Sequence, residues 1–282
     1  MLIINYTHIL IMSAEQDNIH YTIEEIVKPD DEDTIIIPKI VFIVPYRDRE
    51  QQQQLFASQM KIVMADYNEM NYKICYIHQC DTRNFNRGAM KNIGFLFVKE
   101  KYPNNYKEIT LVFNDVDTMP IAKNLLPYET KYNNVKHFYG FTNTLGGIVS
   151  ILAGDFEKVN GFPNYWSWGY EDNLFLNRIL VEKMNVDRDV FYSHKDPIIQ
   201  QFSDSSERII NKIEYEKYKR QLDDGINKLA NVKYEYNDKT GFVDVVSFDT
   251  YYKHDATQDK IYDLKQGPRP FHKRRGTMSM FM

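Results

Sequence analysis

Residues 40–49 read IVFIVPYRDR, an apolar run that passes directly into a polar segment with two arginines. The run 40–44 has the length and the β-branched content of a strand that is buried on both faces. One helix face is then indicated by apolar residues at helical spacing, namely Phe56, Met60, Val63, Met64 and Tyr67. This stretch therefore predicts a strand followed by a helix, the unit from which α/β domains are built.

The same unit continues along the chain. A second strand is predicted over 72–77 (YKICYI) and a third over 109–113 (ITLVF). A helix between them is indicated by Met90, Ile93, Phe97 and Val98. Strands that alternate with helices favour an α/β fold with a mixed, mostly parallel sheet flanked by helices. In such sheets ligands bind beyond the carboxyl ends of the strands.

Composition excludes some classes of protein. The 282 residues carry 35 Lys and Arg against 39 Asp and Glu, a net charge of −4, which argues against a polycationic nucleic-acid binder. The apolar opening 1–12 is shorter than the ~20 residues that span a bilayer, and no signal peptide can be read there. We therefore expect a soluble, cytoplasmic protein. Cys75 and Cys80 are expected to be reduced core thiols.

The two ends of the chain differ from its middle. An acidic run at 30–33 between two prolines predicts an N-terminal arm or linker over 1–37. Basic residues near the other end predict a solvated tail over 256–282. The folded domain is expected over 38–255.

Polar segments follow all three predicted strands. Arg47 and Arg49 follow the first, where they can clamp phosphate or form ordinary surface ion pairs. Phe85-Asn86-Arg87 opens the second helix, and helix N-termini favour anions. Because the carboxyl ends of parallel strands share one edge of a sheet, these segments are expected to converge there.

Two carboxylates end the third strand. Asp115 and Asp117 stand two residues apart and face the same side of an extended segment. Their oxygens suit Mg²⁺ or Mn²⁺ bridging a diphosphate, although a turn that caps the next element is an equal alternative. His194 joins such a site only if it reaches this edge.

The densest pattern is 160–178, NGFPNYWSWGYEDNLFLNR, in which aromatic residues are interrupted by glycines and followed by acids. Six of the 12 glycines and both tryptophans fall within 140–169. Aromatic faces stack on sugar rings and carboxylates accept hydrogen bonds from hydroxyls, so a sugar-binding pocket is one interpretation. An aromatic minicore before an acidic helix N-terminus is the other.

Together these segments resemble, in content and order, the β-1,4-galactosyltransferase family of inverting enzymes that use a UDP-sugar donor. The resemblance spans roughly residues 38–252. It rests on FIVPYRDRE, FNRGAMKNIGF, FNDVDTMP, GGIVSILAGDFEKVNGFPNYWSWGYED, a downstream histidine and DDGINKL. It implies a nucleotide-diphospho-sugar transferase (GT-A-like) fold, with the catalytic domain over 38–255.

The resemblance also implies roles for single positions. Donor binding is implied for Pro45, Tyr46, Arg47, Arg49, Phe85, Arg87, Asp115, Val116, Asp117, Gly147 and Trp168. Acceptor binding is implied for Trp168, Gly169, Asp172 and Asn173, and binding of Mn²⁺ or Mg²⁺ for Asp117 and His194. Catalysis is implied for Asp172, as general base, and for Glu171. Inversion needs such a base, together with a metal that stabilises the departing diphosphate.

Three positions depart from the family pattern. Asn173 stands where members commonly have another acid, and Phe191 where many have a methionine metal ligand. Thr144 stands where galactose-specific members carry tyrosine, which leaves room for an N-acetyl group. The expected activity is therefore galactose transfer from UDP-galactose to a carbohydrate acceptor, with UDP-GalNAc as an alternative donor. A catalytically silent sugar- or nucleotide-binding module is the competing hypothesis, whereas a nucleotidyltransferase leaves the aromatic segment unexplained.

Overall fold

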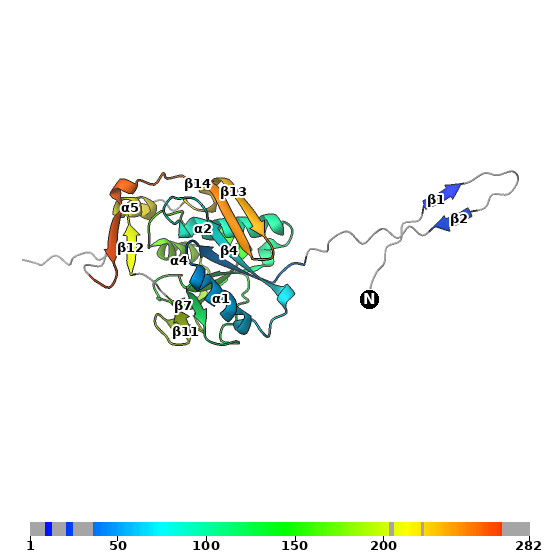
Figure 1. Ribbon diagram of the computed structural model, residues 1–282, viewed down its shortest axis with the longest axis horizontal. Coiled ribbons are helices and arrows are strands. Elements are labelled where there is room, and N and C mark those ends of the chain that lie inside the picture. The colour runs from blue at the N-terminus through cyan, green and yellow to red at the C-terminus, as the bar shows by residue number, and fades with distance from the viewer. Residues whose placement is uncertain (1–8, 13–20, 25–35, 203–205, 221–222, 267–282) are drawn as a thin grey trace, which may run out of the picture. The chain divides into compact units, whose positions relative to one another are not determined.

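The computed structural model describes residues 9–12, 21–24, 36–202, 206–220 and 223–266 (Figure 1). The chain divides into two compact units, Met1–Ile36 and Ile37–Met282. In the first unit, β1 (Ile9–Met12) pairs antiparallel with β2 (Tyr21–Glu24). The acidic run at 30–33 and the basic residues beyond 266 lie outside the described residues.

A nine-stranded mixed sheet forms the centre of the second unit. Its middle strands β4 (Tyr72–Gln79), β3 (Ile40–Tyr46) and β5 (Thr110–Asn114) are parallel, as the sequence predicts. On one side of them lie β14 (Phe242–Asp249), which is parallel to β4, and β13 (Ala230–Asn237). On the other side lie β8 (Ile148–Leu152), β7 (Asn134–Gly140), β10 (Tyr192–Ser193) and β9 (Asn185–Asp187).

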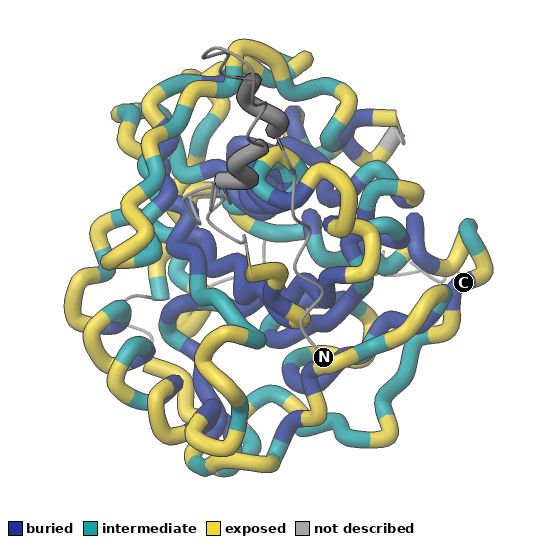
Figure 2. Tube along the Cα trace, turned by 90° about the vertical axis from the view of Figure 1, so that its right-hand side faces the viewer, coloured by how far each residue is buried: buried dark blue, intermediate teal, exposed yellow. Residues whose placement is uncertain are grey.

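Helices cover both faces of this sheet. Side chains of β3 alternate between two cores: Ile40, Phe42 and Val44 pack in the same core as α1 (Glu50–Val63), whereas Val41 and Ile43 share a core with α2 (Arg87–Lys101). The buried segments gather inside the unit and the exposed ones surround them (Figure 2). Each large apolar side chain so buried contributes about 1.5–3 kcal/mol. The predicted first helix ends earlier than its apolar pattern, since Tyr67 lies beyond α1.

Smaller elements surround the sheet. Two further antiparallel pairs are β6 (Thr118–Pro120) with β11 (Ile199–Gln201), and β12 (Glu207–Ile210) with β15 (Lys260–Asp263). The remaining α-helices are α3 (Ala153–Lys158), α4 (Glu171–Val181) and α5 (Lys212–Arg220). Short 3₁₀ turns occupy Glu69–Asn71, Tyr106–Glu108, Ile226–Lys228 and Ala256–Gln258.

Two expectations from the sequence need correction. The predicted solvated tail, 256–282, contains folded structure, because β15 pairs with β12 and Asp259 accepts hydrogen bonds from Asn84 and Asn211. The charged Asp259 side chain is thus held by hydrogen bonds to the folded domain, which the composition of the segment does not show. Cys75 is buried as expected, but Cys80 is exposed and so is not a core thiol.

No helix within the described ranges has both the length and the apolar character needed to cross a membrane.

Candidate active site

The N-terminus of α2 is locked to the aromatic segment that starts at Asn160. Asn86 caps the helix by accepting a hydrogen bond from the Ala89 amide at 2.9 Å, and its own amide group donates to the Asn164 carbonyl at 3.0 Å. Gly88 permits this contact, because a Cβ there would lie 2.1 Å from the Pro163 carbonyl oxygen. These bonds fix Arg87, the first residue of α2, at the carboxyl edge of the sheet.

The Arg87 side chain gathers three carboxylates. Its Nε donates to Asp115 Oδ1 at 2.9 Å and its Nη2 to Asp115 Oδ2 at 3.0 Å, a bidentate pair. Its Nη1 donates to Glu171 Oε1 at 2.8 Å and to Asp172 Oδ1 at 2.9 Å. Arg87 thus joins the end of β5 to the start of α4. The predicted meeting of the start of α2 with the end of β5 is what the geometry shows.

A buried lysine completes the group. Lys91, one turn further along α2 and only 1% exposed, donates from Nζ to Asp172 Oδ1 at 3.0 Å. Its ammonium group also lies 4.0 Å from the centre of the Phe162 ring, a cation–π contact in a site shielded from water. Asp172 therefore has two cationic partners from one helix.

Burial and neighbouring charges shift the pKa values of Asp172 and Glu171 in opposite directions. Burial alone would raise the pKa of Asp172, but the positive charges of Arg87 and Lys91 outweigh it, and the pKa lies below its usual value. Burial and the charge of Asp172 raise the pKa of Glu171. Glu171 Oε2 is also buried without a hydrogen-bond partner among the described residues. The lowered pKa keeps Asp172 ionised near neutral pH.

The loop before β8 packs against the start of α4. Gly146 lies so close that a Cβ there would be 2.3 Å from Asp172 Oδ2. The Leu145 amide donates to the Asp172 carbonyl at 3.1 Å, and the Asn173 side chain donates to the Asn143 carbonyl at 2.9 Å. Thr144 is half-buried in this loop. Gly147 follows with a φ of +76°, a left-handed conformation that favours glycine.

Tyr139 interacts with both Asp117 and His194. The hydroxyl of Thr118 donates to Asp117 Oδ1 at 3.0 Å, and the pKa of Asp117 is raised by burial and then by the charge of Asp115. The charge of Asp117 acts on Tyr139, whose ring centre is 6.4 Å from that of His194. Phe191, in contrast, packs against His137 at 4.9 Å.

The residues that follow β3 meet those that precede α2. The Arg47 guanidinium lies 5.3 Å from the centre of the Phe85 ring, and Tyr46 packs edge-on against His78 at 5.2 Å. Burial lowers the pKa of Arg47, and the negative charges of Asp48 and Asp81 act in the opposite direction by raising it. Arg49 is the N-cap residue of α1, and its charge acts on Asp117. Pro45 lies in β3, and Val116 is buried between the two aspartates.

The aromatic segment leads into α4 through an unusual turn. Trp168 is 40% exposed, and its amide donates to the Ile209 carbonyl at 2.9 Å. Gly169 and Tyr170 both have positive φ, +94° and +84°, although a left-handed conformation disfavours a tyrosine. Tyr170 packs edge-on against Tyr215 of α5 with ring centres 4.3 Å apart. The minicore interpretation holds for Trp166, which is a core residue, whereas Trp168 faces solvent.

Family models locate this arrangement among known proteins. A model described as the N-terminal region of glycosyl transferase group 7 matches residues 3–129, and one described as the N-terminal domain of galactosyltransferase matches 127–197. The two matches overlap at 127–129 and together cover residues 3–197, which include the ends of β3 and β5 and the start of α4. The chain belongs to the β-1,4-galactosyltransferase family.

Named relatives in this family agree with the models. A xylosylprotein 4-β-galactosyltransferase of Caenorhabditis elegans is 32% identical over 160 residues, which cover 53% of each chain. A β-1,4-galactosyltransferase 7 of Drosophila melanogaster is 30% identical over 161 residues, 54% of this chain and 48% of that protein. The chain therefore spans about half the length of the curated relatives it matches.

Solved structures of the family confirm the GT-A fold. A mutant β-1,4-galactosyltransferase 7 of Drosophila, crystallised with manganese, UDP-Gal and xylobiose, superposes with a TM-score of 0.58 at 21% identity. The match covers 78% of this chain and 97% of that one. The catalytic domain of the same enzyme with xylobiose gives a TM-score of 0.57 at 22% identity.

Lys91 is the site residue that the sequence analysis missed. It stands four residues after Arg87 and so lies on the same side of the helix, which is the signal that could have found it. The apolar residues around it mark a buried helix face, where a lysine is rare unless it is paired. A search for its partner would have led to the family's acidic pair at Glu171 and Asp172.

Proposed function

We propose that the chain is a metal-dependent, inverting galactosyltransferase that moves galactose from UDP-galactose to a sugar acceptor. The observation that carries the proposal is the convergence of Asp115, Glu171 and Asp172 on Arg87 at the carboxyl edge of the sheet. Membership of the β-1,4-galactosyltransferase family and the names of the relatives support it.

Asp172 is proposed as the general base. Inversion requires one carboxylate to take the proton of the acceptor hydroxyl as that oxygen attacks the anomeric carbon from the face opposite UDP. A carboxylate with a lowered pKa is ionised at neutral pH and can accept this proton. Glu171, with a buried oxygen that lacks a described partner, is proposed to accept a hydrogen bond from a sugar hydroxyl.

The donor is proposed to lie over the ends of β3, α2 and β5. Arg47 and Phe85 lie together there and offer a cation and an aromatic face to a nucleotide. Tyr46 and Arg49 stand beside them, and Arg87 lies between the donor and the acids. Trp168, half-exposed next to Gly169, is proposed to contact both sugars, with Asn173 on the acceptor side.

A divalent cation is proposed between Asp117 and His194. A carboxylate oxygen and an imidazole nitrogen suit Mn²⁺, and carboxylates also suit Mg²⁺. Asp117 acts on Tyr139 through its charge and the His194 ring lies near that tyrosine, while the Thr118 hydroxyl orients Asp117. The chemistry of this donor set fits such an ion. When bound, the ion supplies positive charge that stabilises the departing diphosphate. Phe191 supplies no ligand, which leaves two proposed protein ligands.

The test is transfer by the full chain with Mn²⁺, using UDP-galactose and a panel of monosaccharides and glycosides that begins with xylosides. Xylosides come first because the names of the first relatives include a xylosylprotein substrate and a bound xylobiose. The expected result is a galactosylated product of inverted configuration whose formation stops when EDTA removes the metal. Binding of UDP-galactose without transfer to any acceptor would favour the silent sugar-binding module instead.

Thr144 favours UDP-GalNAc as a second donor. Its short side chain lies in the loop that ends at Gly146 beside Asp172, where a larger residue would take up space. We expect the wild type to use both donors and Thr144→Tyr to lose UDP-GalNAc transfer by roughly tenfold or more, while UDP-galactose transfer persists. Competing-donor assays with product masses measure this ratio. Turnover of UDP-galactose alone by the wild type would exclude the GalNAc activity.

Gly146 sets the position of the proposed base. In Gly146→Ala the new methyl group would displace the Asp172 carboxylate, which Arg87 and Lys91 hold in place. Because a shift of about 1 Å can cost about 100-fold in rate, we expect kcat to fall by that order. Gly154→Ala, in α3 and away from the acids, is the matched control. Equal kcat in the two variants would contradict this role.

A further inference from the structure

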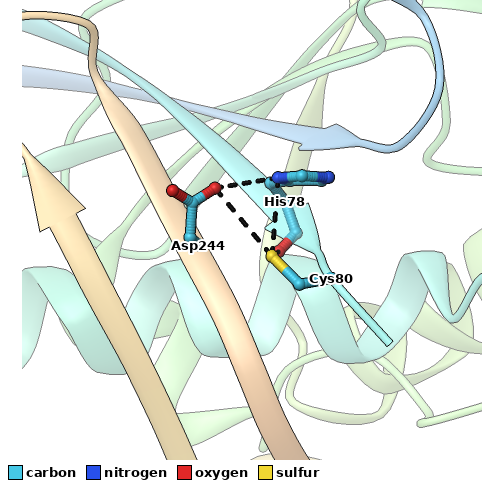
Figure 3. A group of neighbouring side chains, drawn as sticks. All are labelled: His78, Cys80 and Asp244. Carbon is cyan, nitrogen blue, oxygen red and sulfur yellow. Dashed lines mark hydrogen bonds and ion pairs between the residues drawn. The ribbon is translucent and has the colours of Figure 1, made fainter. Parts of the chain in front are cut away.

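Three side chains with metal-binding atoms meet where the end of β4 lies beside β14, outside the acidic site. His78 on β4 and Asp244 on β14 stand directly opposite in the register of the two parallel strands. Cys80 follows His78 by two residues, so both point to the same side of an extended chain. Figure 3 shows the three side chains facing one another. Their ligand atoms all lie within 4.8 Å of one another.

The contacts converge on a single nitrogen. His78 Nδ1 is 2.8 Å from Asp244 Oδ1 and 3.5 Å from Cys80 Sγ, and Sγ is 3.9 Å from the same Oδ1. A catalytic Cys-His-Asp relay needs thiol and carboxylate on opposite ring nitrogens. Here both share Nδ1, so the geometry is that of a chelate and not of a proton relay.

The separations match those around a tetrahedral cation. Zn–N and Zn–O bonds near 2.1 Å and Zn–S bonds near 2.3 Å place neighbouring ligand atoms about 3.4–3.6 Å apart. The two sulfur distances lie close to that range, and the shorter N···O distance is a hydrogen bond that widens when a cation replaces the shared proton. The backbone needs no change, because Cys80 is already tied to β14 through its amide and the Val245 carbonyl at 3.1 Å.

We propose that His78, Cys80 and Asp244 form a second divalent-cation site, and that Zn²⁺ is the ion it takes. Nitrogen, sulfur and oxygen ligands together favour Zn²⁺ over the oxygen-preferring Mg²⁺. Cys80 is exposed and the His78 and Asp244 side chains are 29% and 44% exposed, so water can fill the fourth position. This site is separate from Asp117 and His194 and does not depend on the proposed transferase activity.

Such an ion would join the β13–β14 hairpin to the central strands. Asp244 lies on β14, which meets the rest of the sheet through β4. A cation that binds only the folded chain stabilises it by mass action. In Asp117→Asn/His194→Ala, which lacks the other proposed cation site, we therefore expect Zn²⁺ to raise the melting temperature of the chelator-treated protein. The rise should be absent when Cys80→Ser is added.

The direct test is a calorimetric titration of the metal-free full chain with ZnCl₂. The protein for this titration is Asp117→Asn/His194→Ala, in which the other proposed cation site has been removed. We expect one Zn²⁺ per chain, and at least tenfold weaker binding when Cys80→Ser is added, since even outer-shell changes cost 10–100-fold. Co²⁺ in place of Zn²⁺ should give the absorption of a cobalt–thiolate bond, and Cys80→Ser should abolish it.

Alkylation supplies an independent measurement. Zn²⁺ should protect Cys80 from iodoacetamide, while Cys75, which is buried, serves as the internal control in the same peptide map. His78→Ala should remove this protection without altering the fold, because His78 is half-buried near the end of β4. Unprotected Cys80, or Zn²⁺ affinity that survives both substitutions, would overturn the proposal. Loss of sugar transfer in the Asp117→Asn/His194→Ala background does not bear on it.

Discussion

Asp172→Asn is expected to lower the kcat of galactose transfer by about 10²- to 10⁴-fold, the range that a general base contributes. The amide cannot take the proton of the acceptor hydroxyl, while the shape of the side chain is kept. Steady-state kinetics with saturating UDP-galactose and Mn²⁺ measure the change. Binding of UDP-galactose, measured by calorimetry, should persist, because the proposed donor contacts lie at the ends of β3 and β5.

Two control variants test whether the loss of kcat is specific to Asp172. Asp189→Asn removes an exposed aspartate outside the acidic cluster and should keep wild-type kcat. Glu171→Gln leaves the proposed base, Asp172, in place and keeps a hydrogen-bonding group at position 171. It should therefore lose less activity than Asp172→Asn. If Asp172→Asn were as active as Asp189→Asn, another residue would have to act as the base.

The second large effect is on stability. Asp172→Asn leaves the buried ammonium of Lys91 without its anion, and loss of one partner from a buried ion pair typically costs 3–5 kcal/mol. We expect the free energy of unfolding to fall by about 3 kcal/mol, because Arg87 keeps Asp115 and Glu171. In Lys91→Met/Asp172→Asn the unpaired charge is gone, so stability should return while kcat stays low.

Urea unfolding of the wild type, the single variant and the double variant measures these differences. The pKa of Asp172 is lower in the folded chain, so its pairing stabilises the fold at neutral pH and is lost as the pH falls through the folded pKa. The gap between wild type and Asp172→Asn should therefore close in acid. A double variant no more stable than the single one would show that Lys91 is not held by Asp172. Recovery of kcat in that variant would contradict the proposed base.

The parts of the fold that local sequence specifies were predicted well. The strand 40–44, the helix face from Phe56 to Val63 and the strand end at Asp115 and Asp117 follow from apolar periodicity and from residues that lie close in sequence. The convergence of strand ends followed from the parallel order alone. The family resemblance then supplied Glu171 and Asp172, which periodicity reads only as an acidic helix start.

What the sequence could not supply depends on contacts between distant segments. Lys91 meets Asp172 across 81 residues, and Asp244 meets His78 across 166. The pairing of β15 with β12 is equally remote, so basic residues after 255 looked like a solvated tail. Sheet order and register decide each of these contacts, and neither leaves a periodic pattern in the chain.

Tyr170 links the acidic pair to a helix that carries none of the proposed catalytic groups. A tyrosine in a left-handed conformation costs of order 1–3 kcal/mol and persists only where its surroundings hold it. Its ring packs on Tyr215 of α5, and the next residue along the chain is Glu171. The backbone angle at which α4 begins, and with it the aim of both carboxylates, is thus set partly by an aromatic neighbour 45 residues downstream. α5 therefore supports the position of Glu171 and Asp172, and substitutions in α5 are expected to change the alignment of these two carboxylates.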